Sequence, residues 1–401
     1  MKCRLSNSAN PPLVSLPRAR GRCKRGFSST VAACLRLCLV LFFAAQLFHS
    51  TAADAAQEWK QEWEKTVQSA KGEREIVIYG PHNPMYSPLW EAFEKTYPGV
   101  KINFLPGKGS EHGQRILAER RAAKYLVDAV MGGPSTYRSF PQGTLESIRR
   151  QLLVPEVKDE SAWWGKKFWF ADPQNQSAIV VSGEVGTRRG SYNTELLDPK
   201  EIQSWWDLLN PKFKGKLGTF DPLVAGGGGE SFAFFYDAPA LGPRFIQRLL
   251  TETGILITRN LEQGADWLAH GRIVFYIGSG QPITKAKRQG LPVDLLPHAL
   301  KEGEIMGGGA CCMALLNRAP HPNAAKLFLN WVLSREGQIA WQKYSEANSL
   351  RMDIPKDDLP AWAVPQKGVR YYMLNASENQ NPAKVKALEK VVSAALKKAQ
   401  Q

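Results

Sequence analysis

Residues 76–135 decide the fold class, and they read IVIYGPHNPMYSPLWEAFEKTYPGVKINFLPGKGSEHGQRILAERRAAKYLVDAVMGGPS. Three apolar runs, at 76–79, 100–105 and 126–131, predict strands. Two amphipathic helices are predicted between them, the first with Leu89, Trp90 and Phe93 on its apolar face and the second with Ile116 and Leu117. Strand, helix, strand, helix and strand with short loops predict an α/β fold with a parallel sheet.

A glycine- or proline-rich loop follows each of five predicted strands. The later strands are GKLGTF at 215–220 and GRIVFYI at 271–277. The five loops are GPHNP at 80–84, PGKGS at 106–110, GGPS at 132–135, DPLVAGGGGES at 221–231 and GSGQP at 278–282. Ligands of open α/β sheets bind beyond the carboxyl ends of the strands, and small residues let backbone N–H groups approach them. The loops therefore predict a ligand-binding crevice.

These loops, together with EANSLR at 346–351, supply the candidate ligand contacts. They are His82, Asn83, Ser110, Gly132, Gly133, Ser135, Asp221, Gly227, Gly228, Ser279, Gln281, Asn348 and Arg351. Several have a structural alternative. His82 and Asn83 are also turn formers, Ser110 is also a helix cap, and Arg351 either pairs with a ligand carboxylate or phosphonate or forms a structural ion pair.

The glycine run at 226–229 is the most unusual local feature, because four glycines cost backbone entropy. It indicates close backbone approach to a ligand or a mobile closing loop.

The N-terminal segment is typical of a secretory signal peptide. Residues 1–36 are basic, residues 37–48 are apolar apart from one Gln, and small residues follow at Ala53 and Ala55. Twelve residues are too few to span a bilayer, which takes about 20. We expect a signal peptide over residues 1–55, cleavage near Ala55 and a periplasmic location; an uncleaved anchor is the alternative.

Removal of this segment changes the charge and the cysteine content. It holds eight of the 52 basic residues and one of the 37 acidic ones, so the net charge of +15 falls to +8. No basic run longer than a pair remains, which argues against nucleic-acid binding. Of six cysteines only Cys311 and Cys312 remain, and an adjacent pair lacks zinc-ligand spacing. We expect two small apolar residues on a buried strand, with no metal or cofactor.

Four segments resemble one known family. They are EWEKTVQSAKGEREIVIYG at 62–80, LWEAFEKTYPGVKINF at 89–104, SYNTELLDPKEIQSWWDLLNPKFKGKLG at 191–218 and APHPNAAKLFLNWVLSREGQ at 319–338. The chain from about Glu58 to Arg351 resembles the family 1 extracellular solute-binding proteins, which include ferric-ion, thiamine, polyamine and phosphonate binders. The resemblance implies the two-lobed type II periplasmic-binding-protein fold.

Further expectations follow from the resemblance. Extended crossovers join the lobes near Val180–Tyr192 and near Pro297–Gly303. Lobe 1 takes residues 56–183 and 300–345, and lobe 2 takes 184–299 and 346–401. The protein is a non-catalytic monomer that closes on a small-molecule ligand and delivers it to an ABC permease in the inner membrane.

The resemblance also bears on the ligand. The family's ferric-ion binders place adjacent tyrosines where this chain has Gln281-Pro282, and a carboxylate near the place of Gly133. Both are missing, so a small organic or anionic solute is expected. The alternatives are a ferric-ion or iron-chelate binder, and an enzyme on the same fold with Cys311 or Cys312 as nucleophile.

Overall fold

The computed structural model describes residues 57–83, 86–137, 140–224, 227–278, 280–308, 311–345 and 347–401. The expected signal peptide and its cleavage point lie outside these ranges. The chain divides into two units, Met1–Glu58 and Trp59–Gln401, and the second contains both sheets described below. Within the described ranges no helix combines the length and the apolar character that a bilayer crossing requires.

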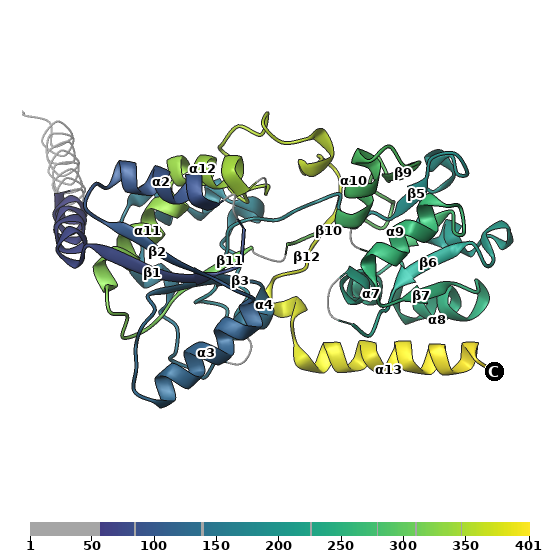
Figure 1. Cartoon of the computed structure of the whole chain (residues 1–401), viewed down its shortest axis with the longest axis horizontal. Coiled ribbons are helices and arrows are strands. Elements are labelled where there is room, and N and C mark those ends of the chain that lie inside the picture. The colour runs from purple at the N-terminus through teal and green to yellow at the C-terminus, as the bar shows by residue number, and fades with distance from the viewer. Residues whose placement is uncertain are drawn as a thin grey trace, which may run out of the picture. The chain divides into compact units, whose positions relative to one another are not determined.

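The first lobe is built on a five-stranded sheet with strand order β2-β1-β3-β11-β4 (Figure 1). Its strands are β1 (Glu75–Gly80), β2 (Lys101–Pro106), β3 (Ala129–Gly132), β4 (Ile179–Val180) and β11 (Cys312–Leu315). β1 pairs in parallel with β2 and β3, whereas β11 runs antiparallel to β3 and β4. The parallel part confirms the prediction from residues 76–135.

The helices of this lobe bury the apolar faces expected from their sequences. They are a helix at residues 57–73, α2 (Ser87–Thr96), α3 (Gly109–Arg121), α4 (Pro134–Tyr137), α5 (Ile148–Gln151), α6 (Pro155–Lys158), α11 (Pro322–Leu333) and α12 (Arg335–Ser345). Leu89, Trp90 and Phe93 of α2 lie in the lobe's core, where the Phe93 ring meets Phe328 of α11 edge to face. The segment from Pro322 to Ser345 forms two successive helices, α11 and α12.

The second lobe has its own five-stranded sheet, in the order β7-β6-β8-β5-β9. Its strands are β5 (Ser191–Asn193), β6 (Leu217–Phe220), β7 (Leu256–Thr258), β8 (Phe275–Ile277) and β9 (Val293–Leu295). Its helices are α7 (Gly227–Asp237), α8 (Gly242–Glu252), α9 (Leu261–Ala269), α10 (Gln281–Arg288) and the C-terminal α13 (Pro382–Ala399). α13 packs along α8 and α7 and so covers one side of this lobe (Figure 1). The lobe has hydrophobic clusters of its own.

The chain passes between the two sheets three times. The first passage runs from β4 to β5, inside the expected segment Val180–Tyr192. The second leaves β9 and continues through β10 (Glu304–Met306) to β11, beyond the expected Pro297–Gly303. The third includes β12 (Tyr371–Met373), which pairs in parallel with β10.

The third passage differs from the expected division at residue 346. Leu350 is buried in the core of the first lobe, and Ser349 bridges to Ser182. The chain therefore stays with the first lobe beyond α12, because the apolar Leu350 side chain is buried there. It joins the second core only from β12, where Leu374 is buried and Tyr372 packs at its margin.

Candidate functional site

In both lobes, strands that pair in parallel end at one edge of the sheet. β1 and β3 of the first lobe end at Gly80 and Gly132, and the parallel strands β6 and β8 of the second end at Phe220 and Ile277. α3, α7 and α10 begin within a few residues of strand ends. The partial positive charge of a helix N-terminus attracts negative groups, so these edges are the candidate ligand-binding edges.

Two of the candidates in the first lobe, Gly132 and Gly133, lie around the buried residue Thr136. The Thr136 side chain is fully buried, and its Oγ1 has no hydrogen-bond partner among the described residues. A Cβ atom built on Gly132 or on Gly109 would lie 2.3 Å from this oxygen, so Gly109 and Gly132 must lack side chains. Gly133 accepts a hydrogen bond from the Thr136 N–H at 3.0 Å, and Ser110 is the second residue of α3. The structure thus brings Gly132 and Gly133 close to Gly109, the residue that precedes Ser110.

The remaining first-lobe candidates lie on the loops around this edge. His82 and Ser135 are exposed, and Asn83 accepts a hydrogen bond from the Tyr86 N–H at 3.1 Å. Asn83 thereby forms the turn that precedes α2, which is the structural alternative considered for it. Ligand contact by His82, Asn83 and Ser135 stays a prediction.

Asp221 and the glycines that follow it have internal partners. The buried Asp221 carboxylate accepts the Arg259 Nε at 2.7 Å and the Leu223 N–H at 2.8 Å. A Cβ on Gly228 would lie 2.4 Å from the Phe220 carbonyl oxygen. Gly227 and Gly228 belong to α7, so the glycines let a helix approach the end of β6 rather than forming one long loop. The close approach inferred from the glycine run is therefore made to the chain itself.

Gln281 lies at the first position of α10 and is exposed. Ser279 is outside the described residues. Gln281 and Pro282, which match the tyrosine pair of the iron binders, are thus the first two residues of α10, and Pro282 is buried.

Arg351 corrects the ligand interpretation in favour of the structural one. Its side chain is only 2% exposed. It donates to both Asp353 carboxylate oxygens, to the Leu333 carbonyl at 2.9 Å and to Glu156 Oε2 at 3.5 Å. With its guanidinium committed in this way, Arg351 ties the segment after α12 to the end of α11.

Asn348 is also buried, and it contacts Gly183 of the first passage. Its Nδ2 donates to the Gly183 carbonyl at 3.1 Å, and its Oδ1 has no hydrogen-bond partner among the described residues. Asn348 thus holds the backbone where the chain leaves β4.

Sequence reasoning missed a group of charged residues where the passages meet. Glu184 and Arg188 lie on the first passage, and Glu230 lies in the first turn of α7. Arg188 forms an ion pair with Glu230 and donates weakly to the Gly307 carbonyl at 3.5 Å. Burial raises the pKa of Glu184; Arg188 acts against this shift and Glu230 adds to it.

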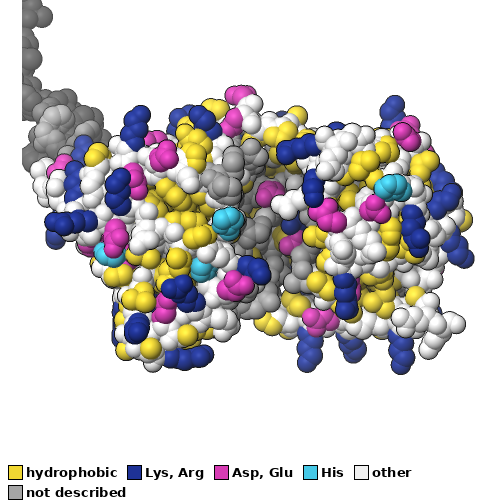
Figure 2. All heavy atoms as spheres, in the orientation of Figure 1, with side chains coloured by type: hydrophobic (Ala, Val, Ile, Leu, Met, Phe, Trp, Pro, Cys, Tyr) yellow, Lys and Arg dark blue, Asp and Glu magenta, His cyan; other side chains and the backbone are white. Residues whose placement is uncertain are grey.

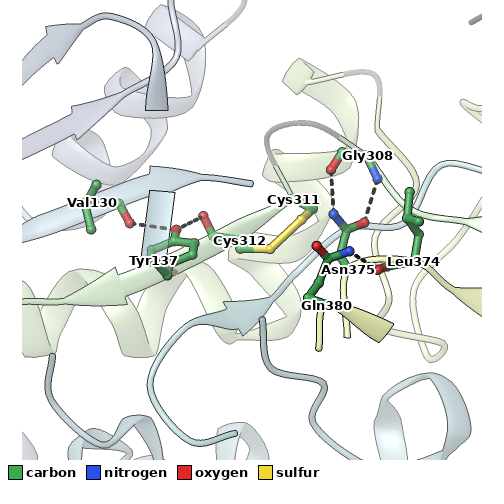
Figure 3. Close-up of a disulfide and its surroundings, with 8 residues drawn as sticks. All are labelled: Val130, Tyr137, Gly308, Cys311, Cys312, Leu374, Asn375 and Gln380. Carbon is green, nitrogen blue, oxygen red and sulfur yellow. Dashed lines mark hydrogen bonds between the residues drawn. A yellow bond between two sulfur atoms is a disulfide. The ribbon is translucent and has the colours of Figure 1, made fainter. Parts of the chain in front are cut away.

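The second and third passages meet the first at the same place. Gly307 donates its N–H to the Glu184 carbonyl at 3.0 Å. Asn375, just after β12, accepts the Gly308 N–H at 2.9 Å and donates to the Gly308 carbonyl at 3.1 Å, as Figure 3 shows. The signal that could have identified these residues is the presence of charge inside a predicted crossover.

Cys311 and Cys312 form a disulfide at the start of β11 (Figure 3). Both side chains are buried, as expected for this strand. The Tyr137 hydroxyl lies between two carbonyls, those of Val130 at 3.2 Å and Cys312 at 2.8 Å. The pair therefore sits between the first-lobe sheet and the second passage.

No group of three or more His, Cys, Asp and Glu suited to a metal ion occurs among the described residues.

The chain is similar to known binding proteins. Residues 172–344 match the model of a family described as bacterial extracellular solute-binding protein. An uncharacterized protein of Haemophilus influenzae is 31% identical over 297 residues, which are 69% of this chain and 78% of that protein. The chain belongs to the bacterial extracellular solute-binding proteins.

Solved structures agree on the fold. A putative extracellular solute-binding protein from Bordetella parapertussis is 16% identical with a TM-score of 0.63, over 80% of this chain and 99% of that one. The periplasmic binding protein AfuA from Actinobacillus pleuropneumoniae, solved with fructose-6-phosphate, is 21% identical with a TM-score of 0.56, over 81% and 98%. A Trichodesmium protein in complex with iron and citrate is 17% identical with a TM-score of 0.58, over 79% and 99%. At these identities the likeness shows the two-lobed fold.

Proposed function

We propose that this protein captures a small organic or anionic solute between its two lobes and delivers it to an ABC permease. The observation that carries the proposal is the junction of the three passages. Two lobes with separate cores are joined there, and Glu184, Arg188 and Glu230 lie at the junction. Hinge movement at such passages closes lobes around a ligand. The type II structures with similar folds include one solved with a sugar phosphate and one with iron and citrate, which supports a soluble ligand.

The proposal includes a non-catalytic role for the cysteines. A cysteine nucleophile reacts as the thiolate. In this structure both sulfur atoms are joined to each other and buried. The enzyme alternative would need this bond to be reduced first, so we assign the pair to the structure of the second passage.

The proposal also includes export, with cleavage near Ala55 and a monomer in the periplasm. Family membership supports an extracellular or periplasmic location. Mass spectrometry of protein exported by a native host should find an N-terminus near Ala56, and an intact leader would contradict this part.

A thermal-shift screen tests solute binding. The panel contains phosphonates, sulfonates, carboxylates, sugar phosphates, polyamines, thiamine, ferric salt and iron citrate. A solute at about 100 times its Kd adds about 2.7 kcal/mol to the free energy of unfolding. Binding is therefore detected as a rise in the unfolding temperature. Small-angle X-ray scattering with the hit should show a smaller radius of gyration. A chain that no solute stabilises or compacts would contradict the proposal.

A further inference from the structure

Glu184 differs from Glu304, another largely buried carboxylate of the passages, because no described residue binds its side chain. Its main chain is fixed by Gly307, but its carboxylate forms no hydrogen bond or ion pair with any described residue. The nearby Glu304 provides the contrast. Glu304 accepts two hydrogen bonds from Arg189 and one from the Gly186 N–H. Both carboxylates lie on passages between the lobes, and only one of them has an internal partner.

Arg188 compensates the charge of Glu184 only in part. Its Oε1 would lie 3.3 Å from a Cβ built on Gly308, so the carboxylate faces the meeting point of the passages. The nearest cation, Arg188, is paired with Glu230. Tyr86, the titratable group from the first lobe, stays neutral because burial raises its pKa to about 12. The Arg188 guanidinium thus lies beside two carboxylates, Glu184 and Glu230, so these three groups together carry a net negative charge when all are ionised.

An unpaired carboxylate in a largely buried position is costly, and such groups are normally paired. Glu184 is nevertheless partly accessible, so a group from outside the protein can reach it. Acidic side chains are visible between the two lobes on the face that Figure 2 shows. A cation or strong hydrogen-bond donor on the ligand would supply the missing partner, with charge-assisted hydrogen bonds.

We propose that the solute carries a protonated amine and that Glu184 binds this amine. The inference rests on the proposed function, and it names the ligand class. A solute that also has an anionic group can place it at the helix N-termini of the strand-end edges while its ammonium group meets Glu184. Burial raises the pKa of Glu184, and a bound ammonium group would act against this shift because it stabilises the ionised form.

A first experiment needs no ligand and uses the exported chain. Glu184→Gln should unfold at the same urea midpoint as the wild type or at a higher one, because no internal partner is lost and an unpaired charge is removed. Any rise in the urea midpoint of Glu184→Gln over the wild type should be larger at pH 7 than at pH 4, because the Glu184 carboxyl group is closer to neutral at pH 4. The matched control Glu304→Gln should unfold at a clearly lower midpoint. A similar loss of stability in Glu184→Gln would reveal an internal partner and overturn the inference.

A second experiment measures affinity by calorimetry for paired probes that differ only in the amine. The pairs are putrescine with butanediol, aminoethylphosphonate with ethylphosphonate, and glucosamine with glucose. We expect the wild type to bind the amine of at least one pair and to bind the matching compound without the amine more weakly. Glu184→Gln should bind that amine at least about tenfold more weakly than the wild type does. Equal binding within a pair, or amine binding that Glu184→Gln leaves unchanged, overturns the amine class. If the broader screen finds a solute without an amine, the amine class is also overturned, but the proposal that the protein binds a solute is retained.

Discussion

Arg189 and Glu304 form a two-point ion pair that joins the first passage to the second. Arg189 Nε lies 2.7 Å from Glu304 Oε1, and Nη2 lies 2.9 Å from Oε2. Their side chains are 1% and 2% exposed. Two hydrogen bonds between planar groups fix orientation as well as distance. This pair therefore holds the two passages in register at the junction.

Removing one charge of this pair should destabilise the protein strongly. In Glu304→Gln the Arg189 guanidinium stays buried without its counter-charge, which costs on the order of 3 kcal/mol. Urea unfolding of the purified protein measures the loss. The control is Glu201→Gln, because Glu201 pairs with Lys212 at the surface, where such pairs contribute about 1 kcal/mol or less. Equal losses in the two variants would show that the buried pair has no special role.

Lys356 should make stability rise between pH 8 and pH 10.5. Burial lowers the pKa of Lys356 from 10.5 to about 8, and its Nζ donates to Gln342 Oε1 and to the Ser349 carbonyl. In this window the unfolded chain binds the proton more tightly than the folded one, so unfolding becomes less favourable as the pH rises. The effect is at most about 3 kcal/mol.

Lys356→Met isolates the contribution of Lys356. The difference in the free energy of unfolding between wild type and variant should increase from pH 8 to pH 10.5, whereas other titrating groups cancel. A difference that is flat across this range would show that Lys356 has an ordinary pKa.

Gly228 should not accept a side chain. In Gly228→Ala the Cβ would lie 2.4 Å from the Phe220 carbonyl oxygen and 2.6 Å from that of Asp221, and these backbone atoms cannot move alone. We expect a loss of about 1–3 kcal/mol in thermal or urea unfolding. Gly72→Ala is the matched control, because nothing lies within 4 Å of its Cβ position in the helix at residues 57–73. It should be neutral or stabilising by up to about 1 kcal/mol.

Arg351→Gln separates a structural arginine from a ligand-binding one. The change removes the bonds to Asp353 and Glu156 and should lower stability by about 2–4 kcal/mol. The affinity for the solute found in the screen, measured at a temperature where the variant is folded, should stay unchanged. Weaker binding with unchanged stability would restore the ligand interpretation of Arg351.

The Cys311–Cys312 disulfide can be detected directly. Trypsin cleavage after Lys301 and Arg318 releases residues 302–318, which contain both cysteines and no others. Without reductant this peptide should be lighter by two hydrogen atoms and resist alkylation, and after reduction it should take two labels. Alkylation of both sulfurs in the unreduced, denatured protein would show two free thiols.

Some of the site follows from sequence and some does not. Glycines 132 and 228 were identified because close backbone approach leaves a local signature in composition. What they approach is a tertiary fact, namely Thr136 for the first and the end of β6 for the second. Glu184 was missed because the feature that distinguishes it is the lack of a side-chain partner among the described residues, which sequence cannot display.

The sequence by itself determined the order of strands and helices in residues 76–135 and hence the α/β class, because local periodicity and turn chemistry depend on neighbouring residues. The two lobes and the place of the first passage followed from the family resemblance. Only the tertiary structure decided which charges are free. Asp221 meets Arg259 across 38 residues, Glu304 meets Arg189 across 115, and Arg351 meets Glu156 across 195. Such partners are decided by packing between distant segments, which leaves the Glu184 carboxylate without one in the part of the chain that the structure describes.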